Sequence, residues 1–142
     1  MLITKENVIE YLTNNLVHTS MIYPIGKEKH FILLNDLNVK LSDSVIVNIP
    51  KGFIFDGSSV PRMFWFALPP YGNFFFAAMI HDYLYQRRYR SKVIGVKRAK
   101  EFADKEMLIW SNVLNNRNFG KRIDNYIRYY AVKFFGMKQY LD

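Results

Sequence analysis

The segment AAMIHDYLYQRR, residues 77–88, places an imidazole and a carboxylate side by side in an otherwise apolar stretch. Three phenylalanines precede it, and apolar residues continue up to His81 and Asp82. A helix that is apolar on nearly every side is usually interior. A carboxylate in such a helix costs several kcal/mol unless it is paired, hydrogen-bonded or bound to a cation. The rest of the sequence must therefore supply polar partners for this pair.

Candidate partners stand in the same helix, in the preceding loop and in the following helix. Tyr85 follows His81 by four residues and shares its helical face. Asp104, in the segment EFADKEM (101–107), belongs to the next predicted helix, with Arg98 and Glu101 one turn earlier. Arg62 carries a planar guanidinium that suits a two-pronged bond to a carboxylate. It ends the loop FDGSSVPR (55–62), whose other polar candidates are Asp56, Ser58 and Ser59.

Two interpretations of these residues stay open, so whether the protein is an enzyme stays open too. In the first, Asp56, Arg62, His81, Asp82 and Asp104 form a buried polar network that fixes how the loop docks on the helices. In the second, His81, Asp82 and Asp104 are candidate catalytic residues, with His81 as a base or metal ligand. Asp82 and Asp56 are then candidate ligands for a divalent cation such as calcium. A His-Asp dipeptide alone is a weak signal, because such pairs arise often by chance.

Other chemistries lack their sequence patterns. The chain has no cysteine, which removes disulfides and thiol chemistry and fits a reducing compartment. It has no GxSxG nucleophile elbow, no glycine-rich phosphate loop and no zinc-type His/Cys spacing. We expect no signal peptide at the N-terminus and no transmembrane segment, because no apolar run approaches the roughly 20 residues that a membrane span needs.

The pattern of apolar residues predicts one α+β domain over residues 1–142, with an N-terminal helix, a small antiparallel sheet and a three-helix C-terminal half. Thr4 is the expected cap of the first helix. The sequence LSDS supplies turn chemistry between the last two strands. The predicted helices span residues 5–17, 73–89, 96–114 and 121–134, and the predicted strands span residues 30–34, 37–41 and 45–49.

The net charge of +8 lies entirely in the second half, where residues 71–142 hold fourteen Lys and Arg against six Asp and Glu. Such a basic surface can neutralise nucleic-acid phosphates or meet an acidic protein, or it can serve only as a solvated rim. Aromatic residues alternate with cations in the C-terminal segment 123–142. This pattern can stack bases, but its helical spacing favours a core face with a basic outer face. The predicted basic patch consists of Arg87, Arg88, Arg90, Lys92, Lys97 and Arg98.

Four stretches together resemble the family called domain of unknown function 1353, which is widespread in tailed bacteriophages and prophages. They read IPKGFIFDGSSVPRMFW (49–65), PPYGNFFFAAMIHDYLY (69–85), Ala103-Asp104 and Phe135-Gly136. The likeness covers about residues 45–140, and residues 1–44 hold the N-terminal helix and first strands. It implies phage origin, in the virion or the host cytoplasm, but no activity. Its signature positions are Asp56, Ser59, Pro61, Arg62, His81, Asp82, Tyr85 and Asp104.

A looser likeness connects residues 77–85 with the catalytic helix of secreted phospholipases A2, C-C-x-x-H-D-x-C-Y. It implies that His81 activates water, that Asp82 binds calcium and that Asp104 on the next helix orients His81. The chain departs from those enzymes elsewhere, since it has no cysteines and PPYGN is too short for their calcium loop.

The function that we predict is a virion or phage-accessory interaction module built around a buried His/Asp/Arg network, with a phage or host protein as partner. A His/Asp hydrolase, metal-assisted or not, is the first alternative. A nucleic-acid-binding protein that uses the basic second half is the second alternative.

Overall fold

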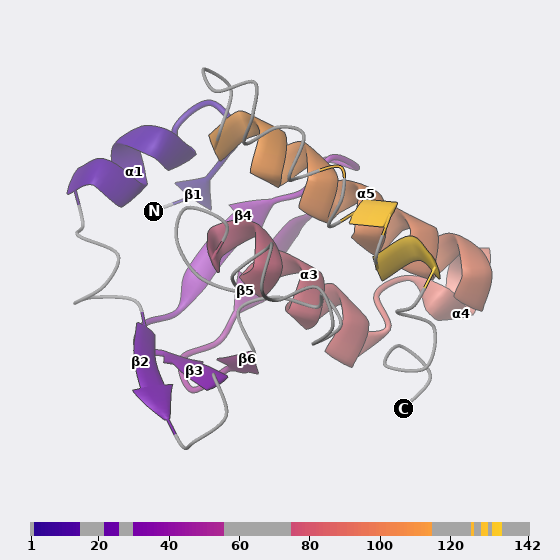
Figure 1. Cartoon of the computed structure of the whole chain (residues 1–142), viewed down its shortest axis with the longest axis horizontal. Helices are drawn as coiled ribbons and strands as arrows, with labels where there is room; N and C mark the ends of the chain where they lie inside the picture. The colour runs from indigo at the N-terminus through magenta and orange to yellow at the C-terminus, as the bar shows by residue number, and fades with distance from the viewer. Residues whose placement is uncertain are drawn as a thin grey trace. The chain divides into compact units, whose positions relative to one another are not determined.

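Strands dominate the first part of the chain and helices the second, which confirms the α+β class with a helical C-terminal half (Figure 1). The structure is a computed structural model and describes residues 2–14, 22–25, 30–55, 75–114, 126, 129–130 and 132–134. The chain divides into two compact units, Met1–Asp56 and Gly57–Asp142. That the whole chain forms one domain stays a prediction.

One three-stranded sheet of the first unit contains β1 (Leu2–Ile3), β4 (Leu37–Lys40) and β5 (Ile46–Ile49), in the order β1-β4-β5. β4 and β5 are antiparallel, and both alternate between buried and exposed residues. Their hairpin closes through LSDS, where Ser44 has a φ of 67° and its amide donates to the carbonyl of Leu41 at 3.0 Å. β1 pairs in parallel with β4, which sequence analysis did not predict because two residues are too few to show an alternation.

The other sheet of this unit contains β2 (Ile22–Ile25), β3 (His30–Leu33) and β6 (Ile54–Phe55), in the order β2-β3-β6 and antiparallel throughout. The turn before β6 explains the glycine of IPKGF. The amide of Phe53 donates to the carbonyl of Pro50 at 3.1 Å, and Gly52 between them has a φ of 88°. This is the turn that requires a left-handed residue at its third position, where glycine is least strained.

The N-terminal helix α1 (Val8–Asn14) begins three residues later than predicted. Residues 5–7 form a turn, and the amide of Val8 donates to the backbone carbonyl of Thr4 at 3.0 Å. The side-chain oxygen of Asn7 accepts a hydrogen bond from the amide of Thr4 at 2.8 Å, and this bond stabilises the turn that precedes the helix. The predicted end of the helix, residues 15–17, lies outside the described residues.

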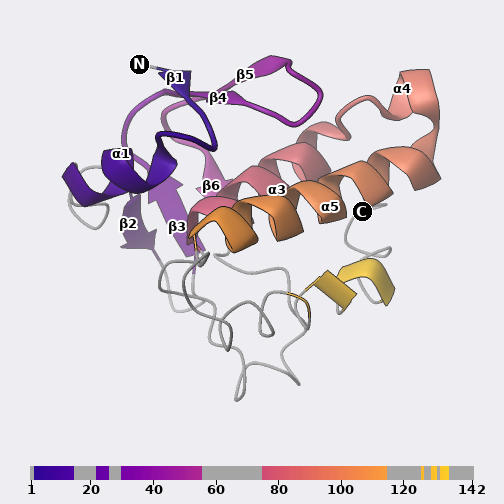
Figure 2. The same ribbon diagram turned by 90° about the horizontal axis from the view of Figure 1, so that it is seen from above.

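Two long antiparallel helices, α3 (Phe75–Arg87) and α5 (Val96–Leu114), form the centre of the second unit and lie side by side (Figure 2). The rings of Phe76 and Trp110 are 5.4 Å apart, and those of Tyr89 and Phe102 are 5.7 Å apart. Residues 76–82 are buried without interruption, which confirms the prediction of an interior helix. The boundaries of α5 agree with the predicted ones.

α3 ends two residues earlier than predicted because Arg88 adopts the left-handed conformation, with a φ of 47°. The amide of Arg88 then donates to the carbonyl of Tyr85 at 3.1 Å, and the amide of Tyr89 to that of Leu84 at 3.0 Å. These two bonds are the Schellman pattern that closes a helix. A short helix, α4 (Ser91–Ile94), follows, and Gly95, with a φ of 89°, separates it from α5.

The C-terminal aromatic residues correct one prediction. Residues 126, 129–130 and 132–134 are helical, but Tyr126, Tyr130 and Phe134 are exposed rather than part of a core face. Val132, by contrast, is fully buried. Positions four apart share one side of a helix, and residue 132 points to the opposite side, so burial of Val132 turns the aromatic side outward.

Among the residues that the structure describes, no helix is long and apolar enough to span a bilayer.

Candidate functional site

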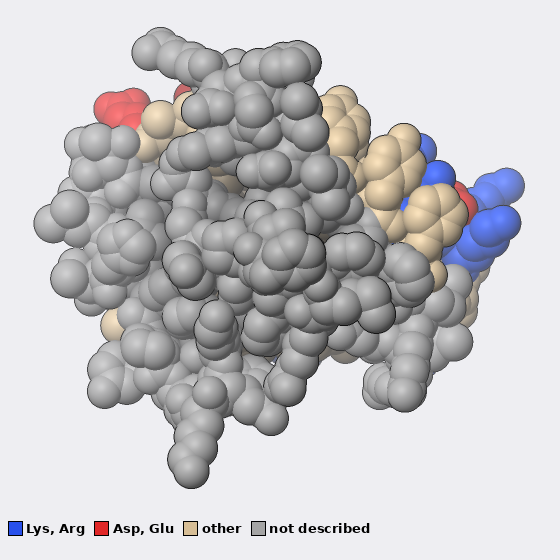
Figure 3. Space-filling model, in the orientation of Figure 1, with Lys and Arg blue, Asp and Glu red and all other residues tan. Residues whose placement is uncertain are grey.

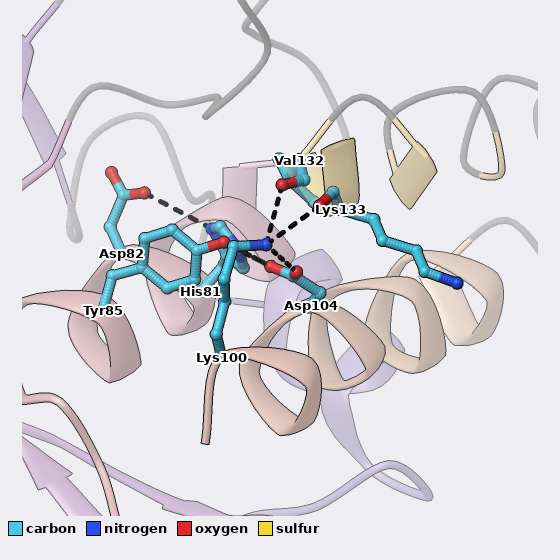
Figure 4. A network of polar contacts seen from close by, with 7 residues as sticks. All are labelled: His81, Asp82, Tyr85, Lys100, Asp104, Val132 and Lys133. Atoms are coloured by element: carbon cyan, nitrogen blue, oxygen red, sulfur yellow. Dashed lines mark hydrogen bonds and ion pairs between the residues drawn. The ribbon is translucent and has the colours of Figure 1, made fainter. Parts of the chain in front are cut away.

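The carboxylate of Asp104 lies at the centre of a buried cluster and is shared by three side chains (Figure 4). His81 Nε2 lies 2.8 Å from Asp104 Oδ1. The hydroxyl of Tyr85 donates to the same oxygen at 2.5 Å. The ammonium of Lys100 donates to Asp104 Oδ2 at 2.7 Å. We call these four residues, His81, Tyr85, Lys100 and Asp104, the Asp104 network.

Helix geometry explains how four residues from two segments converge. His81 and Tyr85 are four residues apart on α3, and Lys100 and Asp104 are four residues apart on α5, so each pair occupies one helical face. The rings of His81 and Tyr85 are 4.0 Å apart. Because α3 and α5 pack antiparallel, the two faces meet. The structure thus brings together three residues that the sequence singled out, His81, Tyr85 and Asp104.

Lys100 extends the network to a third segment. Besides Asp104, its ammonium donates to the backbone carbonyls of Val132 at 2.9 Å and Lys133 at 3.3 Å. An ammonium has three protons, and three acceptors surround this one. Lys100 was not among the residues predicted from the sequence, whereas Arg98 and Glu101 were, and both of these are exposed. The signal was available, because Lys100 precedes Asp104 by four residues and therefore shares its face.

Opposite charges inside the cluster shift its proton affinities. Burial by itself lowers the pKa of His81, but hydrogen bonds and charge attraction from Asp104 and Asp82 outweigh burial and raise this pKa above its ordinary value. Burial by itself raises the pKa of Asp104, but His81, Lys100 and Tyr85 outweigh it and lower that pKa. The cluster therefore favours an ionised Asp104 beside a protonated His81.

Asp82 forms the edge of the site. Its Oδ1 lies 3.7 Å from His81 Nδ1, so the imidazole ring stands between the carboxylates of Asp82 and Asp104 (Figure 4). Only 8% of the Asp82 surface is exposed, against none for His81. Asp82 is therefore the member of the His-Asp pair that lies nearer to solvent.

The predicted loop partners Asp56, Ser58, Ser59 and Arg62 lie outside the described residues. The predicted calcium site, Asp82 with Asp56, thus stays a prediction. Among residues 2–14, 22–25, 30–55, 75–114 and the described C-terminal positions, no three His, Asp or Glu side chains gather as metal ligands. The six cations of the predicted basic patch are all exposed, as a binding surface requires.

Chemically, the carboxylate of Asp104 already has three hydrogen-bond donors from the protein itself. Asp104 accepts two hydrogen bonds on one oxygen and one on the other, and each donor is itself buried. An imidazole held by a carboxylate is also the arrangement that orients and stabilises a histidine base. The geometry is therefore compatible with both interpretations made from the sequence.

Comparison with known proteins identifies the family. Residues 31–132 match the family model described as protein of unknown function (DUF1353). The matched region begins in β3, earlier than the predicted start at residue 45, and includes all four residues of the Asp104 network. No curated protein and no solved structure matches the chain. Since the matched region covers well over half of the sequence, the chain belongs to the DUF1353 family of proteins of unknown function.

Proposed function

We propose that this chain is a bacteriophage-encoded binding module, a virion component or an accessory protein in the host cytoplasm, that acts through its surface rather than by catalysis. The observation that supports this most is the closure of the Asp104 network. His81 is 0% exposed, Asp104 1% and Lys100 3%. A general base must come within hydrogen-bond distance of the proton that it removes, and a sealed imidazole does not offer that approach. The phage context is taken from the motif resemblance.

The contacts of the network suit a structural role. They join three segments of the chain, α3, α5 and the backbone at Val132 and Lys133. Buried charges are tolerated when every donor and acceptor is used, and such networks specify one packing arrangement. A binding module needs a rigid surface, and the buried network holds in place the segments that carry this surface.

The substitution His81→Gln tests the proposal. The contact to Asp104 uses Nε2, and the amide nitrogen of glutamine reaches a similar position, so Gln can keep this hydrogen bond while losing the proton-accepting ring. We expect a phage that carries His81→Gln to plate at wild-type efficiency and to retain the protein in its particles, measured by mass spectrometry. Loss of plating with an unchanged melting temperature would contradict a purely structural role for His81.

A His/Asp hydrolase is the second candidate, and one observation favours it. The Nε2 of His81 binds a carboxylate on the next antiparallel helix, which is the arrangement implied by the likeness to secreted phospholipases A2. In this candidate His81 takes the proton from water, Asp104 stabilises the resulting imidazolium, and Asp82 is the expected calcium ligand. The raised pKa of His81 speaks against it, because a base must be neutral to accept a proton.

The same variant separates the two candidates. Hydrolysis of phospholipid or ester substrates by the wild-type chain, with and without added calcium, is measured beside His81→Gln. A hydrolase loses this activity in the variant while its fold is retained. We expect no such activity in either protein.

A further inference from the structure

The exposed aromatic side of the C-terminal helical segment is a surface that the buried network does not explain. Tyr126, Tyr130 and Phe134 recur every four residues and are 43%, 51% and 68% exposed. Large aromatic side chains bury 150–250 Å² when they are covered, so leaving several in water on one helical face is costly. Such a face is more typical of a binding surface than of a solvated one.

The rings are arranged as flat platforms with a cation beside them. The rings of Tyr130 and Phe134 are 6.2 Å apart and nearly parallel, with 14° between their planes. Tyr129 meets Tyr130 edge-on at 5.2 Å. The ammonium of Lys133 lies 6.0, 5.9 and 5.8 Å from the ring centres of Tyr129, Tyr130 and Phe134. Flat apolar rings and a positive charge thus lie close together. We call the rings of Tyr130 and Phe134 the aromatic platform.

The Asp104 network holds this segment in place. Lys100 binds the carbonyls of Val132 and Lys133, so the backbone that carries Phe134 is tied to α5. Figure 4 shows the side chain of Lys133 extending away from the network while its carbonyl faces inward. The backbone of the aromatic platform is therefore fixed before binding, so little conformational entropy is lost in ordering it when a ligand binds.

Two cations of a basic stretch lie on the same helix as the lysine that holds the platform segment. Between Asp82 and Glu101 the sequence has no acidic residue, and it carries six exposed cations. Lys97 and Arg98 lie within one turn of Lys100, whose ammonium contacts the platform segment. Figure 3 shows Lys and Arg side chains at the α4 end of the molecule directly beside uncharged ones. We call Arg87, Arg88, Arg90, Lys92, Lys97 and Arg98 the basic turn.

Two arginines of the basic turn occupy strained backbone positions. Arg88 has a φ of 47° and Arg90 a φ of 62°, values that glycine or asparagine adopts at lower cost. Residues in such conformations concentrate at functional sites. Arginine at these positions costs stability but adds positive charge, and a phosphate-binding surface needs that charge.

We propose that the aromatic platform and the basic turn together bind single-stranded nucleic acid. This proposal rests on the chain being a binding module and names the class of its partner. Bases stack on Tyr130 and Phe134, whose rings accept any base because every base has a flat face. Phosphates pair with Lys133 and with Lys97 and Arg98 of the basic turn. A duplex offers the phosphates but keeps its bases stacked internally, so the aromatic rings select the single strand.

The test is the affinity of the full chain for a short fluorescein-labelled oligothymidylate, measured by fluorescence anisotropy. Replacing both platform rings, Tyr130→Ala with Phe134→Ala, should weaken binding at least about tenfold. The matched control replaces two exposed aliphatic residues of the first unit, Ile46→Ala with Ile54→Ala, and should leave affinity unchanged. Circular dichroism verifies that each variant keeps its helices.

The contribution of charge is measured from the salt dependence of the same binding. Removing Lys97 and Arg98 together should reduce the slope of log affinity against log salt by about 1.4, because each phosphate contact on a single strand contributes about 0.7. Removing the exposed Lys40 and Lys51 of the first unit should leave the slope unchanged.

Three results would overturn the proposal: full affinity in the double aromatic variant, equal or tighter binding of duplex DNA, or binding of anionic lipid vesicles but not of the oligonucleotide. If the oligonucleotide does not bind but the protein is present in phage particles, the partner class is wrong and the binding module stands. If it binds but His81→Gln stops plating with the fold intact, the non-catalytic function is wrong and the nucleic-acid surface stands.

Discussion

Asp104 explains how four polar side chains can be buried together. Its two oxygens accept hydrogen bonds from an imidazole, a phenol and an ammonium, so each charged group of the network has a polar partner. The attraction between Lys100 and Asp104 offsets the cost of taking both from water. Asp82 supplies a second negative charge on the far side of His81. A protonated His81 is thereby balanced by its neighbours.

Stability should depend on pH through His81 and Asp104. Because the folded pKa of His81 is raised above 6.5, its contribution is complete below that pH and is lost as pH rises through the folded pKa. Because the folded pKa of Asp104 is lowered below 3.8, its contribution is complete above that pH and is lost as pH falls through the folded pKa. We expect the two contributions together to be largest between pH 3.8 and 6.5.

The measurement is the free energy of unfolding by urea at a series of pH values. His81→Gln should flatten the decline above pH 6.5, because it removes the imidazole whose pKa folding raises. An unchanged decline in His81→Gln would assign the pH dependence to other groups.

At the scale of elements, the ends of helices and strands depend on a few left-handed residues. Gly52 makes the turn before β6, Ser44 closes the β4–β5 hairpin, and Arg88 and Gly95 delimit the helices of the second unit. The glycine of IPKGF thus has a conformational explanation that requires no ligand. The presence of this glycine in the family motif is therefore explained by folding and is no sign of a functional site.

Gly52→Ala should destabilise the protein by about 1 kcal/mol, because alanine is strained at a φ of 88°. Apart from Gly52 and its two chain neighbours, no described residue has an atom within 4 Å of the position that the added methyl group would take, so the cost comes from the backbone conformation. Thermal unfolding measures it, and Lys51→Ala in the same turn is the control because its side chain is exposed. Equal melting temperatures for the two variants would mean that the turn relaxes without cost.

At the scale of the whole molecule, charge divides in the same way as the fold. Met1–Asp56 holds five Lys and Arg and six Asp and Glu, whereas Gly57–Asp142 holds fifteen and six, so their net charges are −1 and +9. The Asp104 network, the aromatic platform and the basic turn all belong to the second unit. We therefore expect the partner to be bound by this unit.

Lys100→Met should loosen the second unit and leave the first unchanged. The substitution leaves Asp104 and the two carbonyls without their ammonium donor, at a cost of roughly 3 kcal/mol. Hydrogen exchange measured by mass spectrometry should become faster in peptides covering residues 126–134 and α5, but not in those covering β4 and β5. Lys92→Met is the control because Lys92 is exposed. Uniform acceleration across both units would show that the network stabilises the whole chain.

Local sequence patterns determined much of this protein. Short apolar runs bounded by turn residues predicted β4 and β5, apolar spacing predicted α3 and α5, and a doublet of imidazole and carboxylate in an apolar helix predicted buried partners. These features depend on residues near one another in the chain, and so they are readable from it. The spacing of His81, Tyr85 and Asp104 belongs to this class, because helical periodicity alone places each on its face.

Only the tertiary structure decided which side of each element is buried and which groups meet. Spacing alone could not show that Val132 faces inward and Tyr126, Tyr130 and Phe134 outward, because an aromatic stripe fits either environment. Spacing places Lys100 on the face of Asp104, but its bonds to the carbonyls of Val132 and Lys133 exist only when α5 and the C-terminal segment meet. The two-residue strands β1 and β6 form only because β4 and β3 offer unpaired edges. Contacts of this kind join residues distant in the sequence, and their energies are realised only when the chain has folded.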